Sequence, residues 1–384
     1  MRKTITLFSL LVMLVLAASA QKESKGYTGD VTDVVTIDKL PESGFYNKIW
    51  QPYIARWQKN YYVVTYSLQL TGKGDMGDML CSISKDGGKT WSPPKMIYDH
   101  KIPNGSRQYA YANSVLFIPE GQKFLWLFGM RCPIYYRDSE DSELIASYSC
   151  DGGITWQPVE VLNEFSSPLI TNAGIVTVNE NGITRYLLPV HRNTKDKDPL
   201  GDREQFVLQS TNLLNWELAA YIPRPADVWI HEGNIAEGDN PGELKIVMRT
   251  AQYENSDLAL PVPRAWSSVS KDNGKTWSMS VEEPALYNTA AKGFYGKDSK
   301  GRHIYVYNDG PKRERRGLYY VVKEPGKEWS EPRLFYWDNN RNSYPTLIER
   351  EPGVFLCVWD SSDDPGVKRT NIRFGILDLN KQFK

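Results

Sequence analysis

A glutamate and a tyrosine offer the clearest chemistry in this sequence. Glu232 lies in the segment HEGNIAE at 231–237, and Tyr344 lies in NSYPTL at 342–347. A free phenol with a pKa of about 10 is a poor nucleophile at neutral pH, so it needs a neighbouring base. A carboxylate can take its proton. If the fold brings the two side chains together, Tyr344 is a candidate nucleophile and Glu232 is its base.

Arginines near these two residues indicate that an anionic group could be bound beside them. Arg249 closes the strand that follows Glu232, and a cluster that runs from Arg313 to Arg316 precedes another strand. The forked guanidinium group is suited to a carboxylate. Any one of these residues is more often a packing or surface group, but their coincidence with a glutamate and a tyrosine favours a site.

His231 is expected to orient a neighbour or line the pocket rather than to bind a metal. The other three histidines show no ligand spacing relative to it: His100, His191 and His303. The ligands of metal sites in proteins usually lie at characteristic spacings along the sequence. The sequence therefore predicts no catalytic metal, and it indicates no other cofactor.

A repeat of about 60 residues must position these side chains. Three segments match almost letter for letter: SKDGGKTW at 84–91, SCDGGITW at 149–156 and SKDNGKTW at 270–277. Degraded copies begin at Ser210 and Val322, so that the starts are 65, 61, 60 and 52 residues apart. The Asp-Gly pairs suit tight turns, the Asp can accept backbone N–H groups, and the Trp can pack on a neighbour. We interpret the turns as structural.

Short alternating strands fill the space between the turns and predict the fold. One strong strand recurs in each repeat, at 61–66, 124–128, 185–190, 244–248, 303–307 and 354–359. This pattern predicts an all-β, six-bladed β-propeller that occupies residues 21–384 as one domain. Ring closure should pair the last blade with either 371–379 or the segment near 34–37.

The repeat also locates the pocket, because the innermost strands of a propeller start beside its central channel. We count forward from the Trp of each turn to the expected start of the next inner strand. A count of 16 residues from Trp156, Trp216 and Trp277 gives Asn172, Glu232 and Gly293. A count of 15 from Trp329 gives Tyr344, and a count of 20 from Trp91 gives Tyr111. The equivalent in the first repeat is Trp50, Gln51 and Pro52. These residues should surround one mouth of the channel.

Composition and charge exclude several classes of function. Residues 1–20 have a basic start, an apolar run and small residues before Gln21, as in a cleaved secretory signal peptide. The whole chain has 46 basic and 46 acidic residues, so nothing favours nucleic acid. No later run is apolar enough to span a bilayer, and residue 21 is not a lipobox Cys. We expect a secreted or periplasmic protein.

The aromatic composition favours a carbohydrate ligand. The chain has 12 Trp and 23 Tyr, whose rings can stack on sugars while their polar atoms form hydrogen bonds.

The turns and the Tyr344 segment together resemble the sialidase (neuraminidase) superfamily, whose Ser-x-Asp-x-Gly-x-x-Trp turns are called Asp-boxes. The resemblance covers essentially the mature chain. It implies retaining hydrolysis of terminal sialic acids by a Tyr nucleophile, an assisting Glu, an Asp acid/base and three arginines on the substrate carboxylate. Residue by residue it implies Tyr344 as the nucleophile, Glu232 as its partner, Arg249 as the second arginine and Arg315 or a neighbour as the third.

The first repeat departs from the family pattern. Sialidases have Arg-Ile-Pro where this chain has Trp50-Gln51-Pro52, so Trp50 replaces the first arginine and Lys48 is a poor substitute. A Trp in that position favours stacking on a less acidic sugar. The acid/base is expected in the loop before the first Asp-box, where Asp75 is preferred because Asp78 is near enough to the strand to be structural.

These observations predict a sialidase-like exo-glycosidase that removes terminal sugars from a glycan, either sialic acid or another, acidic or plant-derived, sugar. Tyr344 is the nucleophile, Glu232 its base and Asp75 the acid/base. The substrate-binding residues are Arg249, Arg315, Trp50, Gln51 and His231. One alternative is a propeller glycosidase that uses two carboxylates, as exo-arabinanases do. Another is a carbohydrate-binding propeller without catalysis.

Overall fold

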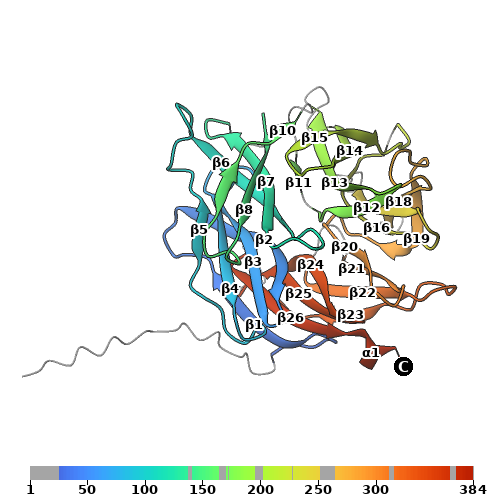
Figure 1. The fold of residues 1–384 in the computed structure, drawn as a ribbon. Coiled ribbons are helices and arrows are strands. Elements are labelled where there is room, and N and C mark those ends of the chain that lie inside the picture. Colours follow the sequence, from blue (N-terminus) through green and yellow to red (C-terminus); the bar gives the residue numbers. More distant parts are fainter. Residues whose placement is uncertain are drawn as a thin grey trace, which may run out of the picture.

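In the computed structural model the chain is an all-β propeller whose sheets are arranged around a common centre (Figure 1). The structure describes residues 26–136, 141–163, 170–171, 173–194, 202–226, 228–250, 264–310, 315–363 and 369–383. The expected signal peptide, residues 1–20, lies outside the described residues, and so does Asn172. No helix in the described part of the chain has the length and apolar character needed to cross a membrane.

Most strands that pair within a sheet are neighbours in the chain. One sheet contains β2 (Tyr46–Gln58), β3 (Tyr61–Leu70), β4 (Gly77–Ser84), β5 (Lys95–Tyr98), β6 (Tyr109–Phe117), β7 (Leu125–Pro133), β8 (Glu143–Ser149) and β9 (Gln157–Val159). A second contains β10 (Leu162–Asn163), β11 (Ile170–Thr171), β12 (Val176–Glu180), β13 (Ile183–Thr194), β14 (Asp202–Ser210) and β15 (Asn215–Tyr221). A third contains β16 (Ile230–Glu237), β17 (Leu244–Thr250), β18 (Arg264–Ser270) and β19 (Val281–Tyr287).

Two further four-stranded sheets complete the fold. One contains β20 (Phe294–Lys297), β21 (His303–Asp309), β22 (Gly317–Lys323) and β23 (Arg333–Tyr336). The other contains β24 (Asn342–Glu351), β25 (Val354–Ser361), β26 (Asn371–Asp378) and β1 (Thr32–Lys39), and the short helix α1 (Leu379–Gln382) follows it. All pairings within these two sheets are antiparallel.

The expectation of six blades is wrong for these sheets. Within the described residues the hydrogen-bonded sheets number five. An antiparallel pair between Gly77 in β4 and Tyr111 in β6 joins the strands that the sequence assigned to the first two blades into one sheet. Gly77 is required at this crowded point because a Cβ atom there would meet the backbone of Leu68. The repeat in the sequence does not predict this pairing between two neighbouring repeats.

Both segments considered for ring closure take part in it. β26 pairs with β25, and β1, from the other end of the chain, pairs with β26 as the outermost strand (Figure 1). The register places Val35 opposite Phe374 and Thr36 opposite Arg373. The two alternatives in the sequence are therefore successive strands of one sheet.

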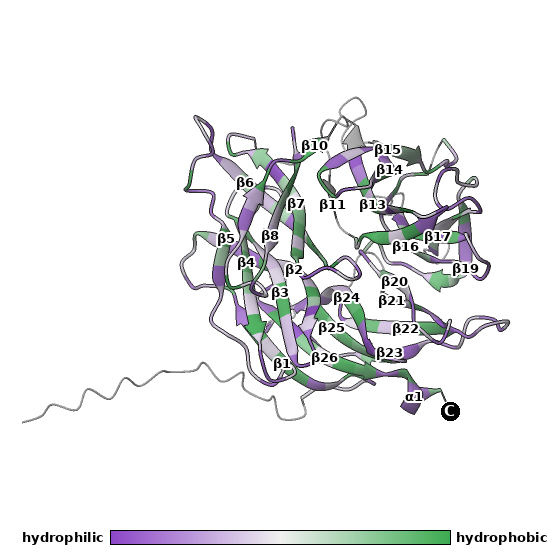
Figure 2. Cartoon of the chain, viewed as in Figure 1, coloured by the Kyte–Doolittle hydropathy of each residue, from purple (hydrophilic) through white to green (hydrophobic). Residues whose placement is uncertain are grey.

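The strongly apolar strands of the repeat lie second from the centre. They fall in β3, β7, β13, β17, β21 and β25, each with a neighbour on both edges. In β25 every residue from Val354 to Ser361 is buried. A strand that is covered on both faces loses the clean alternation of a half-exposed strand. Figure 2 shows the resulting concentration of hydrophobic colour in the strands, with hydrophilic loops at their ends.

The Asp-box turns have the structural role that the sequence predicts. In the third copy, Asp272 Oδ1 accepts from the backbone N–H groups of Lys275 and Thr276, and Asp272 Oδ2 accepts from the Thr276 hydroxyl at 2.6 Å. The indole N–H of Trp277 donates to Gly274 O at 3.2 Å, and its ring packs into the core between neighbouring sheets. The two bonds from the threonine recur at 84–91 and 149–156, where Thr90 donates to Asp86 and Thr155 donates to Asp151.

Replacing Asp272 by Ala is expected to lower the free energy of unfolding by about 1–2 kcal/mol, because several donors of the turn lose their acceptor together. Asp272→Asn keeps one acceptor oxygen and should cost less. Urea denaturation of both variants measures the difference. Equal stability of Asp272→Ala and the wild type would contradict the structural role of the turn.

Candidate active site

A shared backbone irregularity presents one side chain from each of several inner strands to the centre. The register shifts between Trp50 and Tyr53 in β2, between His231 and Asn234 in β16, and between Ser343 and Thr346 in β24. The residue in the middle of each bulge has a positive φ, which is 51° for Gln51, 52° for Glu232 and 53° for Tyr344. Such a conformation costs a residue with a Cβ atom about 1 kcal/mol or more. The bulges therefore bring side chains from different sheets to one place.

The count from the turn tryptophans found some of these positions and missed others. It gave Glu232 and Tyr344 directly and Gln51 as one of three. In β6 the bulge residue is Asn113, with φ of 59°, two residues beyond the predicted Tyr111. Before β20 the residue with positive φ is Ala290, three residues before the predicted Gly293. The spacing errs where the loop between turn and strand changes length.

Tyr344, Glu232 and Arg249 form a continuous chain of hydrogen bonds. The Tyr344 hydroxyl donates to Glu232 Oε1 at 3.0 Å, and Arg249 Nη1 donates to Glu232 Oε2 at 2.8 Å. All three residues are buried, with exposed fractions of 6%, 6% and 7%. The register explains the second contact, because Arg249 in β17 lies opposite His231, next to Glu232, in β16. One oxygen of the carboxylate faces the phenol and the other faces a fixed cation.

The charges in this chain set its protonation. Burial favours a raised pKa for Glu232, but the charge of Arg249 and its hydrogen bond outweigh burial and lower the pKa to about 2. Burial, and then the charge of Glu232, raise the pKa of the Tyr344 phenol. Near neutral pH the phenol therefore holds a proton that points at an ionised carboxylate. This arrangement suits general-base removal of that proton during attack.

Two further guanidinium groups flank the phenol ring. The Arg315 guanidinium carbon lies 5.5 Å from the centre of the Tyr344 ring, and that of Arg369 lies 4.7 Å from it. Arg315 is anchored by a 2.9 Å bond from Nη2 to Ala290 O, and Arg369 by an ion pair of 3.3 Å with Asp360. Burial lowers the pKa of Arg315 to about 10, so it stays charged at neutral pH. These cations favour an anionic group beside Tyr344.

Trp50 and Gln51 lie at the same mouth, but Trp50 is not open to solvent. Its indole is 2% exposed and meets Tyr344 edge to face, with ring centres 5.7 Å apart. Lys48 lies over the indole at 3.7 Å and Arg369 lies over it at 5.2 Å. The expected stacking of a sugar on Trp50 would require these cations to move. The backbone N–H of Gln51 donates to Asp360 Oδ2 at 3.3 Å.

His231 stands behind Glu232, in contact with another sheet. Burial lowers the pKa of the imidazole well below its usual value. The neutral ring accepts a hydrogen bond of 2.7 Å at Nε2 from Arg203, and it lies edge-on to His191 at 5.3 Å. With an exposed fraction of 1%, His231 is placed to hold the strand that carries Glu232.

Asp75 occupies the tip of the loop between β3 and β4. Its side chain is 61% exposed, and Oδ1 forms an ion pair of 2.5 Å with Lys48 Nζ. Burial lowers the pKa of Lys48 to about 8, and the charge of Asp75 opposes that effect. Since Lys48 also covers Trp50, this ion pair connects Asp75 to the mouth that contains Tyr344.

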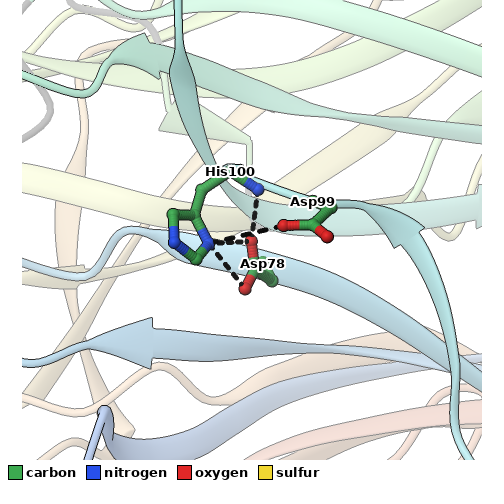
Figure 3. Close-up of side chains that lie close together, drawn as sticks. All are labelled: Asp78, Asp99 and His100. Atoms are coloured by element: carbon green, nitrogen blue, oxygen red, sulfur yellow. Dashed lines mark hydrogen bonds and ion pairs between the residues drawn. The ribbon is translucent and has the colours of Figure 1, made fainter. Parts of the chain in front are cut away.

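Asp78, the other aspartate of this loop, is locked into the fold (Figure 3). It is fully buried, and its carboxylate accepts from the backbone N–H of His100 at 2.6 Å and from the Tyr46 hydroxyl at 2.5 Å. The Nδ1 atom of His100 lies 2.8 and 2.9 Å from the two carboxylate oxygens. Asp99 is near enough to complete a three-residue set of possible metal ligands with Asp78 and His100, but His100 and Asp78 are already bound to each other. Asp78 is structural, as the sequence suggested.

Comparison with known proteins finds a repeat and a fold that this chain shares with them. Residues 234–357 match the BNR repeat-like domain, and residues 82–93 match the BNR/Asp-box repeat. The NanB sialidase of Streptococcus pneumoniae superposes with a TM-score of 0.65 over 90% of this chain and 70% of its own, at 12% identity. This chain therefore contains segments that match the BNR repeat, and its fold is sialidase-like.

Other solved structures share the fold at similarly low identity. The leech intramolecular trans-sialidase complexed with 2,7-anhydro-Neu5Ac gives a TM-score of 0.67 at 14% identity, and the match covers 92% of this chain and 70% of that protein. A protein of unknown function from Dyadobacter fermentans gives 0.66 at 16% identity and covers 92% and 100%. No curated protein matches the sequence.

Sequence reasoning missed two residues of this site, Arg369 and Asp360. Arg369 lies in the loop that leads to the last strand, where no Asp-box provides a count. Asp360 is the next-to-last residue of β25, and it accepts a hydrogen bond of 2.5 Å from the hydroxyl of Ser343, the residue directly before Tyr344. A polar residue at the end of an otherwise apolar strand is a weak signal that could have indicated Asp360.

Proposed function

We propose that this protein is an exo-glycosidase that removes a terminal, acidic sugar from a glycan, with sialic acid as one candidate. The observation that carries the proposal is the hydrogen-bonded chain from Tyr344 through Glu232 to Arg249. It supplies a nucleophile, a base that is already ionised and a cation that keeps the base ionised. The arginines close to the phenol, Arg315 and Arg369, supply the preference for an anionic sugar.

The proposed reaction proceeds in two steps with retention. Tyr344 Oη attacks the anomeric carbon while its proton passes to Glu232, and the bond to the leaving oxygen breaks as Asp75 donates a proton to that oxygen. Water then attacks the same carbon, Asp75 takes the proton of the water, and Glu232 returns its proton to the departing Tyr344 oxygen. For the first step the ion pair between Lys48 and Asp75 has to open.

The geometry favours this chemistry over catalysis by two carboxylates. Besides Glu232, the buried carboxylate nearest the mouth in the described chain is Asp360. It is already engaged by the Ser343 hydroxyl, the Gln51 backbone N–H and Arg369. A general acid or base needs a free oxygen that faces substrate. Asp360 does not meet that requirement, whereas the Tyr344 phenol acts as a nucleophile and has its base in Glu232.

The proposal is tested by incubating the purified protein with aryl glycosides and natural glycans, including sialyl-lactose, and by following released sugar by chromatography. Release of an acidic sugar supports it. Release of a neutral sugar alone would contradict the preference for an anion. Binding of glycans without any release would favour a carbohydrate-binding propeller.

Asp75→Asn is expected to lower kcat/KM on a natural glycan by at least about a hundredfold, because the leaving oxygen loses its acid. The aryl group of an aryl glycoside leaves as a stable phenolate that needs no proton, so kcat/KM on that substrate should fall much less. Parallel rate measurements on the two substrates provide the check. An equal loss on both would contradict the acid role, and Asp78→Asn, which should mainly lower stability, is the matched control.

We also propose that residues 1–20 direct export, so that the enzyme meets its glycan outside the cytoplasm. Mass spectrometry of the protein recovered from the periplasm or medium would identify the new amino terminus, which is expected at Gln21.

A further inference from the structure

The half of the central channel that lies away from Tyr344, called here the far half, contains a cavity. Beyond the residues with positive φ, the inner strands continue away from the mouth of Tyr344 and enclose a volume of about 490 Å³. The cavity is lined from β2, β12, β16, β20 and β24, and its walls include Tyr53, Thr177, Glu237 and Phe294. Pockets of this size commonly hold small-molecule ligands. None of the residues proposed to act in the glycosidase reaction lines it.

Two polar side chains close the inner end of this cavity. Lys292 and Thr346 are 4% and 2% exposed, and both also line a much smaller cavity, of about 10 Å³, between the far half and the mouth. The Lys292 ammonium donates one long bond of 3.4 Å, to Pro345 O. The Thr346 hydroxyl oxygen has no hydrogen-bond partner among the described residues. A buried polar group without a partner costs about 1–3 kcal/mol.

The charge around Lys292 indicates what would satisfy it. Burial lowers the pKa of Lys292 to about 8, and the carboxylates of Glu232 and Asp360 oppose that effect. Both carboxylates are already bound by arginines on the mouth side. An ammonium has three donors, so acceptors from the far side would complete its coordination. A carboxylate offers two oxygens and could reach the ammonium and the Thr346 hydroxyl together.

We propose that the far half of the channel binds a sugar acid of monosaccharide size, with its carboxylate on Lys292 and Thr346 and its hydroxyls toward the wider part of the cavity. Thr177 and Glu237 provide polar partners for hydroxyls there, and Tyr53 and Phe294 provide apolar wall. This site goes beyond the proposed glycosidase function and does not rest on it. Its ligand enters from the opposite face of the propeller.

Isothermal titration of the full chain with glucuronate tests the site, with glucose as the uncharged comparison. Glucuronate is expected to bind, and glucose at least tenfold more weakly. Thr346→Val removes only the hydroxyl and should weaken the binding of glucuronate at least fivefold. Lys292→Met removes the ammonium and should weaken it at least tenfold. Lys300→Met removes an exposed lysine outside the cavity and should leave the affinity unchanged.

Arg369→Met separates this site from the mouth, where a carboxylate could also bind. Retained glucuronate binding in Arg369→Met and its loss in Thr346→Val support the far site. Unchanged affinity in Thr346→Val, or loss only in Arg369→Met, would overturn it. Thermal unfolding of each variant shows whether it is folded, and the nearly isosteric Thr346→Val keeps the test valid if Lys292→Met does not fold.

Discussion

Tyr344→Phe is expected to reduce kcat/KM on any substrate of this protein by at least about a thousandfold. The phenol oxygen is the atom that attacks in the proposed reaction, and phenylalanine removes it without removing the ring. The edge-to-face contact with Trp50 and the flanking guanidinium groups keep their partner. Binding of the sugar should therefore change far less than turnover, and the loss should appear in kcat.

Initial rates and equilibrium binding measured on the same preparation test this expectation. Tyr148→Phe is a suitable control, because it removes a phenol hydroxyl that bonds to Gln157 on the exterior. A loss of less than tenfold in folded Tyr344→Phe would exclude the tyrosine as nucleophile and favour two carboxylates. Trapping the intermediate with an activated fluoro-sugar should place the label on Tyr344 by mass spectrometry.

Arg249→Met is expected to destabilise the protein by about 3–5 kcal/mol at pH 7, because it leaves the buried Glu232 carboxylate without its closest cation. Breaking the pair between Arg131 and Glu143, whose side chains are 25% and 46% exposed, should cost about 1 kcal/mol or less. Urea denaturation of Arg249→Met and Arg131→Met compares a buried and an exposed pair directly. Equal losses in the two variants would contradict the electrostatic role of Arg249.

The same variant should show a distinctive dependence on pH. In the wild type the lowered pKa of Glu232 contributes stability that is present above the unfolded pKa, near 4.5, and is lost as the pH falls toward about 2. Without Arg249, the largest effect that opposes burial is lost, so the pKa of Glu232 rises and protonation relieves the buried charge. The stability difference between variant and wild type should be largest near neutral pH and should shrink toward pH 3. A difference that does not vary with pH would point to lost packing instead.

The sequence was sufficient where one short pattern determines the local structure. The turns around Asp86, Asp151 and Asp272 repeat the same hydrogen bonds, so reading one of them predicted the others. The proximity of Glu232 and Tyr344 also followed from the repeat, because equivalent strands begin at equivalent distances from a turn. Local chemistry of this kind does not depend on the rest of the chain.

Features set by contacts between distant residues could not be predicted in this way. The bridge between Gly77 and Tyr111 depends on a close backbone approach that no pattern encodes. Arg369 reaches Tyr344 from a loop outside the repeat, so no count from a turn tryptophan leads to it. The burial of Trp50 under Lys48 likewise results from packing between segments.

The pairing of β1 with β26 closes the ring between an early and a late strand of the chain, residues 32–39 and 371–378. Until a ribosome has released residues 371–378, strand 32–39 has no partner, and a nascent or truncated chain carries a bare sheet edge. Joining segments more than 300 residues apart also imposes a large loop-closure cost, which tends to slow folding. A chaperone that shields this edge during synthesis would act at the seam of the ring rather than at its functional centre.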